Sequence, residues 1–169
     1  MKKILYLHQY FKASKDSGGT RSYEIATRLV KRGFRIELVT TTPEQRASPE
    51  IIDGVNVHWC KNKYSNKLGF FRRLLSFFLY IFQALKLGLK LDADLIYVSS
   101  TPLTVSIPAI FLSKIKGVPY IFEVRDLWPE VPISMNILKN NLLISLAIFL
   151  EKQAYKHADQ IITLSKDME

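Results

Sequence analysis

The sequence predicts an α/β fold with a doubly wound, mostly parallel sheet of the Rossmann-like type. Apolar stretches of strand length alternate with longer stretches of helix length along the 169 residues. Residues 4–11, 22–30 and 34–40 form a strand, helix and strand whose crossover favours a parallel pair. The unbroken apolar run within 91–100 is typical of a central strand in such a sheet. We expect one domain over residues 1–169.

The remaining elements continue this alternation. Lys31-Arg32-Gly33 ends the first helix, and residues 34–40 then alternate as a strand with one buried side. A turn at Asp53-Gly54 precedes a short strand up to Cys60. We expect helices within 61–91, over 103–116 and over 137–156. Pro108 should kink the second of these helices, and Gly117 should cap its end. Further strands begin at Tyr120 and Ala158, and Ser165 should cap a helix that follows the last strand.

The net charge of +9 is distributed unevenly. Residues 1–91 contain 17 Lys and Arg against 6 Asp and Glu, whereas residues 92–169 contain 7 against 9. This asymmetry indicates an anionic partner for one face, which is a nucleic acid, a membrane or a phosphorylated substrate.

Cysteine content and the N-terminus limit the class of protein. The single cysteine, Cys60, excludes a disulfide framework and a multi-cysteine metal site. His58 has no partner at ligand spacing, so we expect it on a strand face and expect no metal. Met1-Lys2-Lys3 leads directly into the first strand with no signal peptide, and we therefore expect a cytoplasmic protein.

The loop Gly18-Gly19-Thr20-Arg21 lies between the first strand and the first helix. Glycines let the backbone approach a ligand, and the N–H groups at a helix start attract anions. A phosphate is the ligand we expect. The spacing matches neither the dinucleotide fingerprint nor the P-loop, and an ordinary loop-to-helix turn is the alternative.

Residues 61–91 combine aromatic and apolar side chains with flanking cations. The uncharged run from Leu74 to Leu85 is shorter than the ~20 residues that a spanning helix needs. Such a helix suits a lipid interface, and a core helix packed on the sheet is the compatible alternative. The residues expected to face the membrane are Phe70, Phe71, Arg72, Arg73, Phe77 and Phe78.

Polar residues follow the strands where a parallel sheet binds ligands. Arg125 and Asp126 come directly after one strand, and the Asp126 carboxylate can accept a proton or orient a substrate. A structural ion pair, or Asp126 capping the next turn, is the alternative. Trp128 offers an apolar face to a ligand or fills the sheet edge, and Glu130 is a weaker candidate. His8 ends the first strand and either binds substrate or is a core histidine.

Several of these segments together resemble the N-terminal domain of family-four glycosyltransferases, which are retaining enzymes of the two-Rossmann-domain GT-B type. The segment 122–130 resembles amino-sugar transferases of bacterial surface-polysaccharide assembly. The similarity covers nearly the whole chain. The segments that match are Leu7-His8-Gln9-Tyr10-Phe11, the Gly18-Gly19-x-Arg21 loop, the module from Lys31 to Thr40, Ala93 to Tyr97, Phe122 to Glu130, and Ala158 to Ser165.

The resemblance implies a specific activity and a separate role for each of two domains. The N-terminal domain holds the acceptor, and a C-terminal domain, absent from these 169 residues, binds the nucleotide-sugar through two glutamates. We therefore expect this fragment to be inactive alone, with no cofactor and no metal. Gly18, Gly19 and Arg21 would approach the donor diphosphate, and Arg125 and Asp126 would be catalytic. His8, Trp128 and Glu130 would contact the acceptor.

For polysaccharide assembly, the implied acceptor is a sugar carried on a polyprenyl diphosphate. The basic aromatic segment would then hold the domain at the inner face of the cytoplasmic membrane. The alternative is a non-catalytic Rossmann-like module that binds an anionic ligand or nucleic acid. Nucleic acid is disfavoured because the cations are interleaved with apolar residues instead of lining one polar face.

Overall fold

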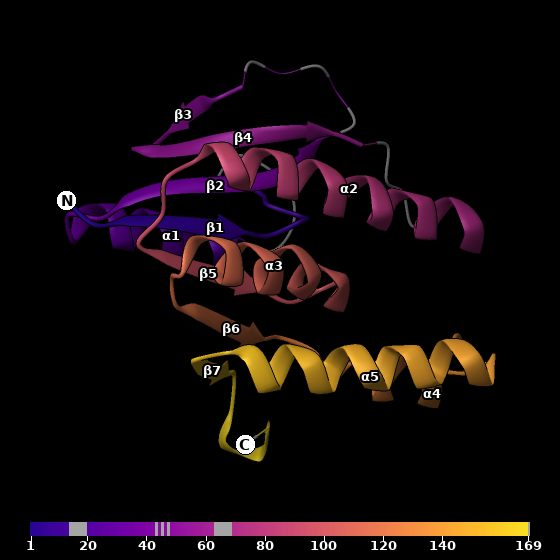
Figure 1. Cartoon of the computed structure of the whole chain (residues 1–169). Coiled ribbons are helices and arrows are strands. Elements are labelled where there is room, and N and C mark those ends of the chain that lie inside the picture. Colours follow the sequence, from indigo (N-terminus) through magenta and orange to yellow (C-terminus); the bar gives the residue numbers. More distant parts are fainter. Residues whose placement is uncertain (14–19, 43, 45, 47, 63–68, 169) are drawn as a thin grey trace.

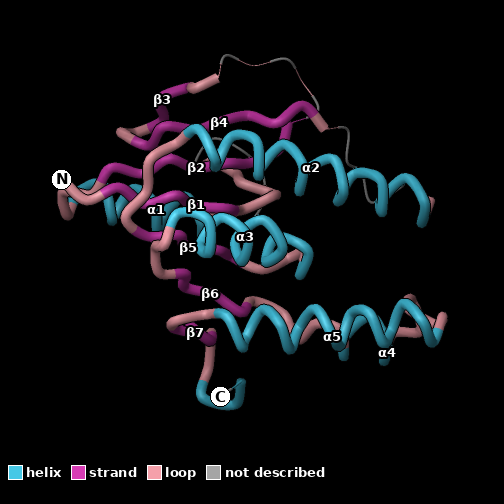
Figure 2. The backbone as a smooth tube through the Cα atoms, in the orientation of Figure 1, coloured by secondary structure: helices cyan, strands magenta, loops and turns pink. Residues whose placement is uncertain are grey.

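The computed structural model contains one seven-stranded sheet with helices on both faces (Figures 1 and 2). It describes residues 1–169 apart from 14–19, 43, 45, 47, 63–68 and 169. The strand order is β3-β4-β2-β1-β5-β6-β7, and only the pairing of β3 with β4 is antiparallel. The strands are β1 (Lys3–Leu7), β2 (Arg35–Thr42), β3 (Glu50–Ile52), β4 (Val55–Lys61), β5 (Leu95–Ser99), β6 (Tyr120–Val124) and β7 (Gln160–Thr163).

The helices form two unequal layers. Helices α2, α3 and α5 cover one face of the sheet, and α1 lies on the other (Figure 1). The α-helices are α1 (Arg21–Lys31), α2 (Phe70–Lys90), α3 (Ser106–Lys116), α4 (Glu130–Ser134) and α5 (Asn141–His157), and 3-10 turns span Leu103–Val105 and Lys166–Met168. The predicted doubly wound α/β fold is confirmed.

Side-chain alternation along β1 divides the core in two. Leu5 and Leu7 point to the side of α2 and α3, where Tyr80 and Leu112 bury them completely. Tyr6 points to the opposite side and packs with the cluster under α1. This period of two is the geometry of a pleated strand whose two faces are both covered.

Three local expectations were wrong. Strand β2 is buried from Ile36 to Thr40 and does not alternate, because it lies inside the sheet between β1 and β4. The helix expected over 103–116 begins with a 3-10 turn at Leu103–Val105, and α3 starts only at Ser106, which puts Pro108 in its first turn, where a missing N–H leaves no hydrogen bond unmade. The expected helix over 137–156 begins only at Asn141, whose predecessor Asn140 accepts two backbone hydrogen bonds as its cap.

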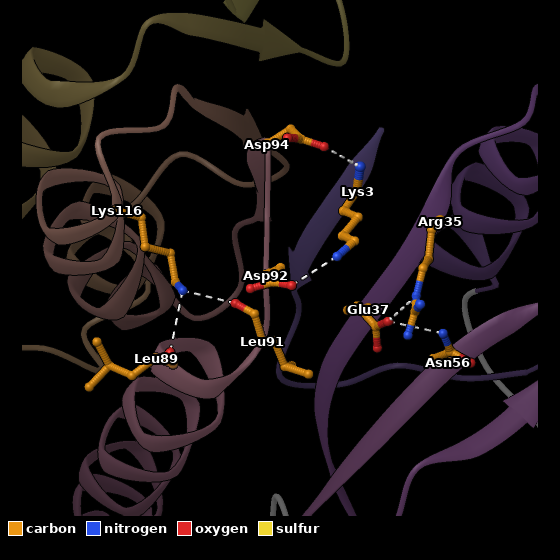
Figure 3. A network of polar contacts seen from close by, with 9 residues as sticks. All are labelled: Lys3, Arg35, Glu37, Asn56, Leu89, Leu91, Asp92, Asp94 and Lys116. Carbon is orange, nitrogen blue, oxygen red and sulfur yellow. Dashed lines mark hydrogen bonds and ion pairs between the residues drawn. The ribbon is translucent and has the colours of Figure 1, made fainter. Parts of the chain in front are cut away.

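The amino ends of the strands are joined by ion pairs and hydrogen bonds (Figure 3). Lys3 donates through Nζ to Asp92 at 2.8 Å and through its backbone N–H to Asp94 at 2.7 Å. Next to β2, Arg35 Nε donates to Glu37 at 2.6 Å. We refer to these contacts as the amino-end network, in which Lys3 is paired with Asp92 and Arg35 is paired with Glu37.

Candidate active site at the carboxyl edge of the sheet

The carboxyl ends of β1, β5 and β6 meet at one edge of the sheet. Leu7 pairs with Val98 and Ser99 pairs with Glu123, so the residues that follow these strands are neighbours. Ligands of open parallel sheets bind outside this edge. The sheet thus brings together the predicted site residues His8, Arg125 and Asp126. We refer to these three residues, together with Arg21 and Glu123, as the carboxyl-edge cluster.

Glu123 is a fully buried carboxylate in the carboxyl-edge cluster. Its Oε1 accepts a hydrogen bond from Arg21 Nε at 2.7 Å, and its Oε2 accepts one from Ser99 Oγ at 2.6 Å. Charge-assisted bonds of this kind fix an arginine more firmly than neutral ones. The bond to Glu123 raises the pKa of Arg21.

Among the described residues, the Arg21 side chain is held through its Nε atom alone. The side chain is 46% exposed, and its terminal amino groups contact no partner among the described residues. Arg21 is the first residue of α1, so its free donors lie beside the N–H groups of the first helical turn. The arrangement offers positive charge to an anion, reduced by the carboxylate behind it.

His8 is buried beside Arg125. Its Nδ1 lies 3.3 Å from the carbonyl of Ser99, and its Nε2 lies 3.4 Å from Arg125 Nη1. The pKa of His8 is lowered to about 4, mainly because the side chain is buried; the positive charge of Arg125 also lowers it, and the hydrogen bond to the Ser99 carbonyl opposes the shift. His8 is therefore neutral near pH 7, with Nδ1–H donating to Ser99 and Nε2 accepting from Arg125.

Asp126 is exposed and held in place by one hydrogen bond. Thr101 Oγ1 donates to Asp126 Oδ2 at 2.6 Å. Thr101 has a φ of 86°, which a β-branched residue rarely adopts, and such backbone outliers gather at functional sites. No ion pair joins Arg125 to Asp126 in the described part of the chain, and the ion-pair alternative is therefore wrong. The carboxylate can accept a proton from a hydroxyl placed outside the edge.

Trp128 and Glu130 lie just beyond Asp126. Trp128 is half-buried, packs on the core cluster under α2 and lines an apolar pocket together with Phe77 and Pro132. Glu130 is exposed as the first residue of α4. The structure thus places Trp128 between the core and the edge, and it leaves Glu130 open to solvent.

Three polar residues of this edge were not singled out by the sequence analysis. Glu123 and Thr101 contact Arg21 and Asp126, as described above. Gln9 is fully buried, and neither its amide nitrogen nor its amide oxygen has a hydrogen-bond partner among the residues that the structure describes. A glutamate at a buried position of the apolar strand Tyr120–Val124 was the available signal, because a carboxylate is buried only with a partner.

Some predicted site residues lie outside the described residues. Gly18 and Gly19 fall there, and so do the side chains of Phe70 and Phe71. On the remainder of α2, Arg72 is exposed, Arg73 and Phe77 are half-buried, and Phe78 is 60% exposed.

The outer surface of the helical layer is apolar on all three helices. On α2, Leu75, Phe78 and Phe82 are exposed at helical spacing, and Phe82 is 69% exposed. On α5, Leu142, Leu146 and Phe149 repeat the pattern, and α3 adds Phe111 and Ile115. We refer to these exposed residues as the outer helix face. No helix in the described residues has the length and hydropathy of a membrane span, as the short uncharged run predicts.

The chain belongs to the Glycosyl transferase 4-like domain family, whose model matches residues 18–169. A comparison with curated protein sequences gave no match. Among solved structures, sucrose-phosphate synthase from Thermosynechococcus elongatus superposes with a TM-score of 0.65 at 10% identity, covering 95% of this chain and 42% of that one. MurG of Acinetobacter baumannii superposes with a TM-score of 0.55 at 12% identity, covering 99% and 43%.

The solved structures support the fold, and the family model supports the family. At such low identity the two solved structures show only that the chain has the Rossmann-like fold of one half of a GT-B glycosyltransferase. The chain spans less than half the length of either structure. The family match indicates a transferase domain.

Proposed function

We propose that this chain is the acceptor-binding half of a retaining, two-domain glycosyltransferase that transfers a sugar from a nucleotide-sugar to a lipid-linked acceptor. The observation that supports this most is the carboxyl-edge cluster in a Glycosyl transferase 4-like domain. The resemblance of segment 122–130 to surface-polysaccharide transferases supports an N-acetylamino sugar or hexose as the transferred group. The reaction needs no metal or cofactor in this proposal.

Asp126 positions the acceptor hydroxyl and takes up its proton as the glycosidic bond forms. The carboxylate is exposed and is held by a hydrogen bond from Thr101. Among the described residues Arg125 has no acidic partner and its side chain contacts only neutral His8, so its positive charge is available to an anionic substrate. Positive charge at the transfer point stabilises the departing diphosphate without a covalent intermediate.

Arg21 approaches the donor diphosphate from the start of α1. Its exposed terminal amino groups and the first-turn N–H groups lie on the same edge as Arg125. The glycines Gly18 and Gly19 lie three and two residues before it in sequence. The nucleotide itself is bound by the second domain of the enzyme.

The outer helix face places the domain on an anionic membrane, where the lipid-linked acceptor resides. Exposed aromatic and aliphatic side chains enter the interface, and Arg72, Lys86 and Lys90 on α2 lie beside them. Each cation near an anionic leaflet adds about 1 kcal/mol. The proposed location is thus the cytoplasmic face of the membrane.

Sugar transfer by the two-domain enzyme tests the catalytic assignment. Asp126→Asn keeps the hydrogen bond from Thr101 but removes the base, and we expect kcat to fall by about a hundredfold or more. Asp92→Asn, an exposed carboxylate of the amino-end network, is the matched control and should transfer normally. Unchanged kcat in Asp126→Asn, with the control also active, would remove Asp126 from the mechanism.

Vesicle sedimentation tests the membrane assignment. The chain should sediment with phosphatidylglycerol vesicles at low salt, and Phe78→Ser with Phe82→Ser should return it to the supernatant. Ile51→Ser, an equally exposed apolar side chain on β3, is the control and should still sediment. Recovery of the unaltered chain in the supernatant contradicts the proposal.

A further inference from the structure

Two adjoining apolar pockets lie next to the carboxyl-edge cluster. They share Leu74 of α2 and the residues Ile137 and Leu138 of the segment that leads into α5. The inner pocket has a volume of about 190 Å³ and reaches Trp128 and Phe77. The outer pocket has a volume of about 500 Å³ and continues along the start of α5.

The two pockets form one groove that runs from the catalytic edge to the outer helix face. At its inner end, Trp128 stands two residues after Asp126 in sequence. At its outer end, Leu142 belongs to the outer helix face and is 69% exposed. We refer to the groove between these two ends as the α2–α5 groove. Its inner end is therefore lined by a close sequence neighbour of Asp126, and its outer end is lined by a residue of the proposed membrane surface.

Positive charge accompanies the apolar lining. Arg73 lines the inner pocket and Lys139 lines the outer one. The described residues that line the two pockets include no aspartate or glutamate. An occupant that matches this lining has an apolar chain and an anionic group at one end.

Resting on the proposed function, we propose that the α2–α5 groove binds the first isoprenoid units of a polyprenyl diphosphate acceptor. The apolar chain enters from the outer helix face and lies between Leu74 and Ile137, with Trp128 at its inner end. The diphosphate then lies toward Arg73 and Arg125, which brings the attached sugar to Asp126. The groove selects the lipid part of the acceptor separately from its sugar.

Trp128 fluorescence measures this binding directly. In a Trp59→Phe background Trp128 is the single tryptophan, because the sequence contains two. Farnesyl diphosphate, used below its micellar concentration, should change Trp128 emission and bind at least tenfold more tightly than inorganic diphosphate. Equal affinity for the two probes would show that only phosphate is recognised and would overturn the proposal.

A pair of matched variants locates the binding site. Ile137→Ser alters a side chain that lines both pockets and is 58% exposed, so folding should be retained, and circular dichroism checks this. We expect about a tenfold loss of farnesyl diphosphate affinity. Leu146→Ser, 53% exposed on α5 but outside the groove, should bind normally. An equal loss in both variants indicates adsorption to the outer helix face and contradicts the groove.

Kinetics separate a failure of the groove from a failure of the proposed function. In the two-domain enzyme, Ile137→Ser should raise KM for a polyprenyl-linked acceptor and leave kcat unchanged. If the unaltered enzyme transfers sugar and Ile137→Ser leaves KM unchanged, the groove assignment is wrong and the function stands. If farnesyl diphosphate binds in the groove and no sugar is transferred, the function is wrong and the groove stands.

Discussion

The two ends of the same sheet hold polar residues in different ways. At the amino end, Lys3 with Asp92 and Arg35 with Glu37 form complete ion pairs (Figure 3). Within the part of the chain that the structure describes, the Arg125 side chain at the carboxyl edge contacts only a neutral histidine, and neither the terminal amino groups of Arg21 nor the amide of Gln9 has a partner. Paired charges tie strands together, whereas incompletely paired charges are available to a ligand. The comparison assigns ligand binding to the carboxyl edge and no part in binding to the amino end.

The buried carboxylates at the two ends of the sheet differ in the same way. Hydrogen bonds from His58, Arg35 and Asn56 lower the pKa of Glu37 against the opposing effect of burial, so this carboxylate is fully satisfied. Glu123 at the other end has two donors, and one of them, Arg21, is also a candidate ligand contact. The buried Glu123 carboxylate can therefore hold Arg21 in position and still leave part of its positive charge for a ligand.

The largest effect on stability is expected from removing Arg21. Arg21→Ala leaves the buried Glu123 carboxylate without its cation, and the free energy of unfolding should fall by about 3 kcal/mol. The double variant Arg21→Ala with Glu123→Gln removes the buried charge as well and should recover part of this loss. Urea denaturation measures both. A double variant as unstable as the sum of the two single variants contradicts the coupling between them.

A somewhat smaller effect should follow from acid, through His8. Its pKa is about 4 in the folded chain and near 6.5 when unfolded, so the unfolded state binds more protons between these values. Stability present at pH 7 is therefore lost as the pH falls from about 6.5 toward 4, by roughly 3 kcal/mol at most.

His8→Gln should flatten this dependence, and denaturation at a series of pH values compares the two chains. The ion pair between Lys3 and Asp92 at the amino end depends on pH in a more acidic range. Lys3 lowers the pKa of Asp92 below its usual 3.8, so the contribution of this pair is present above that value and is lost only in stronger acid. An identical slope in His8→Gln between pH 6.5 and 4 would show that His8 is not responsible.

The smallest effect is expected at the surface of the amino-end network. Lys3→Met removes an ion pair whose Asp92 side chain is 83% exposed, and such pairs contribute little because solvent screens them. We expect an unchanged Tm and unchanged sugar transfer. A clear loss of transfer in Lys3→Met would contradict the assignment of ligand binding to the carboxyl edge alone.

Much of this organisation follows from local sequence pattern. The unbroken apolar run at Leu95–Ser99 predicts a central strand, and Gly117, with a φ of 63°, ends α3 where the sequence places its cap. Asp126 and Arg125 were predicted on the carboxyl edge because they directly follow a strand. These features depend on neighbours within one element and its ends.

The features that were not predicted depend on contacts between distant residues. Arg21 and Glu123 are 102 positions apart, and Thr101 reaches Asp126 across 25. The α2–α5 groove is lined by residues from α2 and from the segment before α5, whose packing only the tertiary structure fixes. The alternation expected in β2 failed for the same reason, because its position between two other strands buries both of its sides.

Hydrogen exchange tests the central claim most directly, because it reports on both ends of the sheet in one measurement. The chain is compared with and without a farnesyl-diphosphate-linked N-acetylamino sugar. We expect slower exchange in peptides covering residues 99–104 and 124–140 at the carboxyl edge, and no change in residues 85–96 at the amino end. Protection confined to the amino end, or no protection at saturating ligand, would contradict the assignment of acceptor binding to the carboxyl edge.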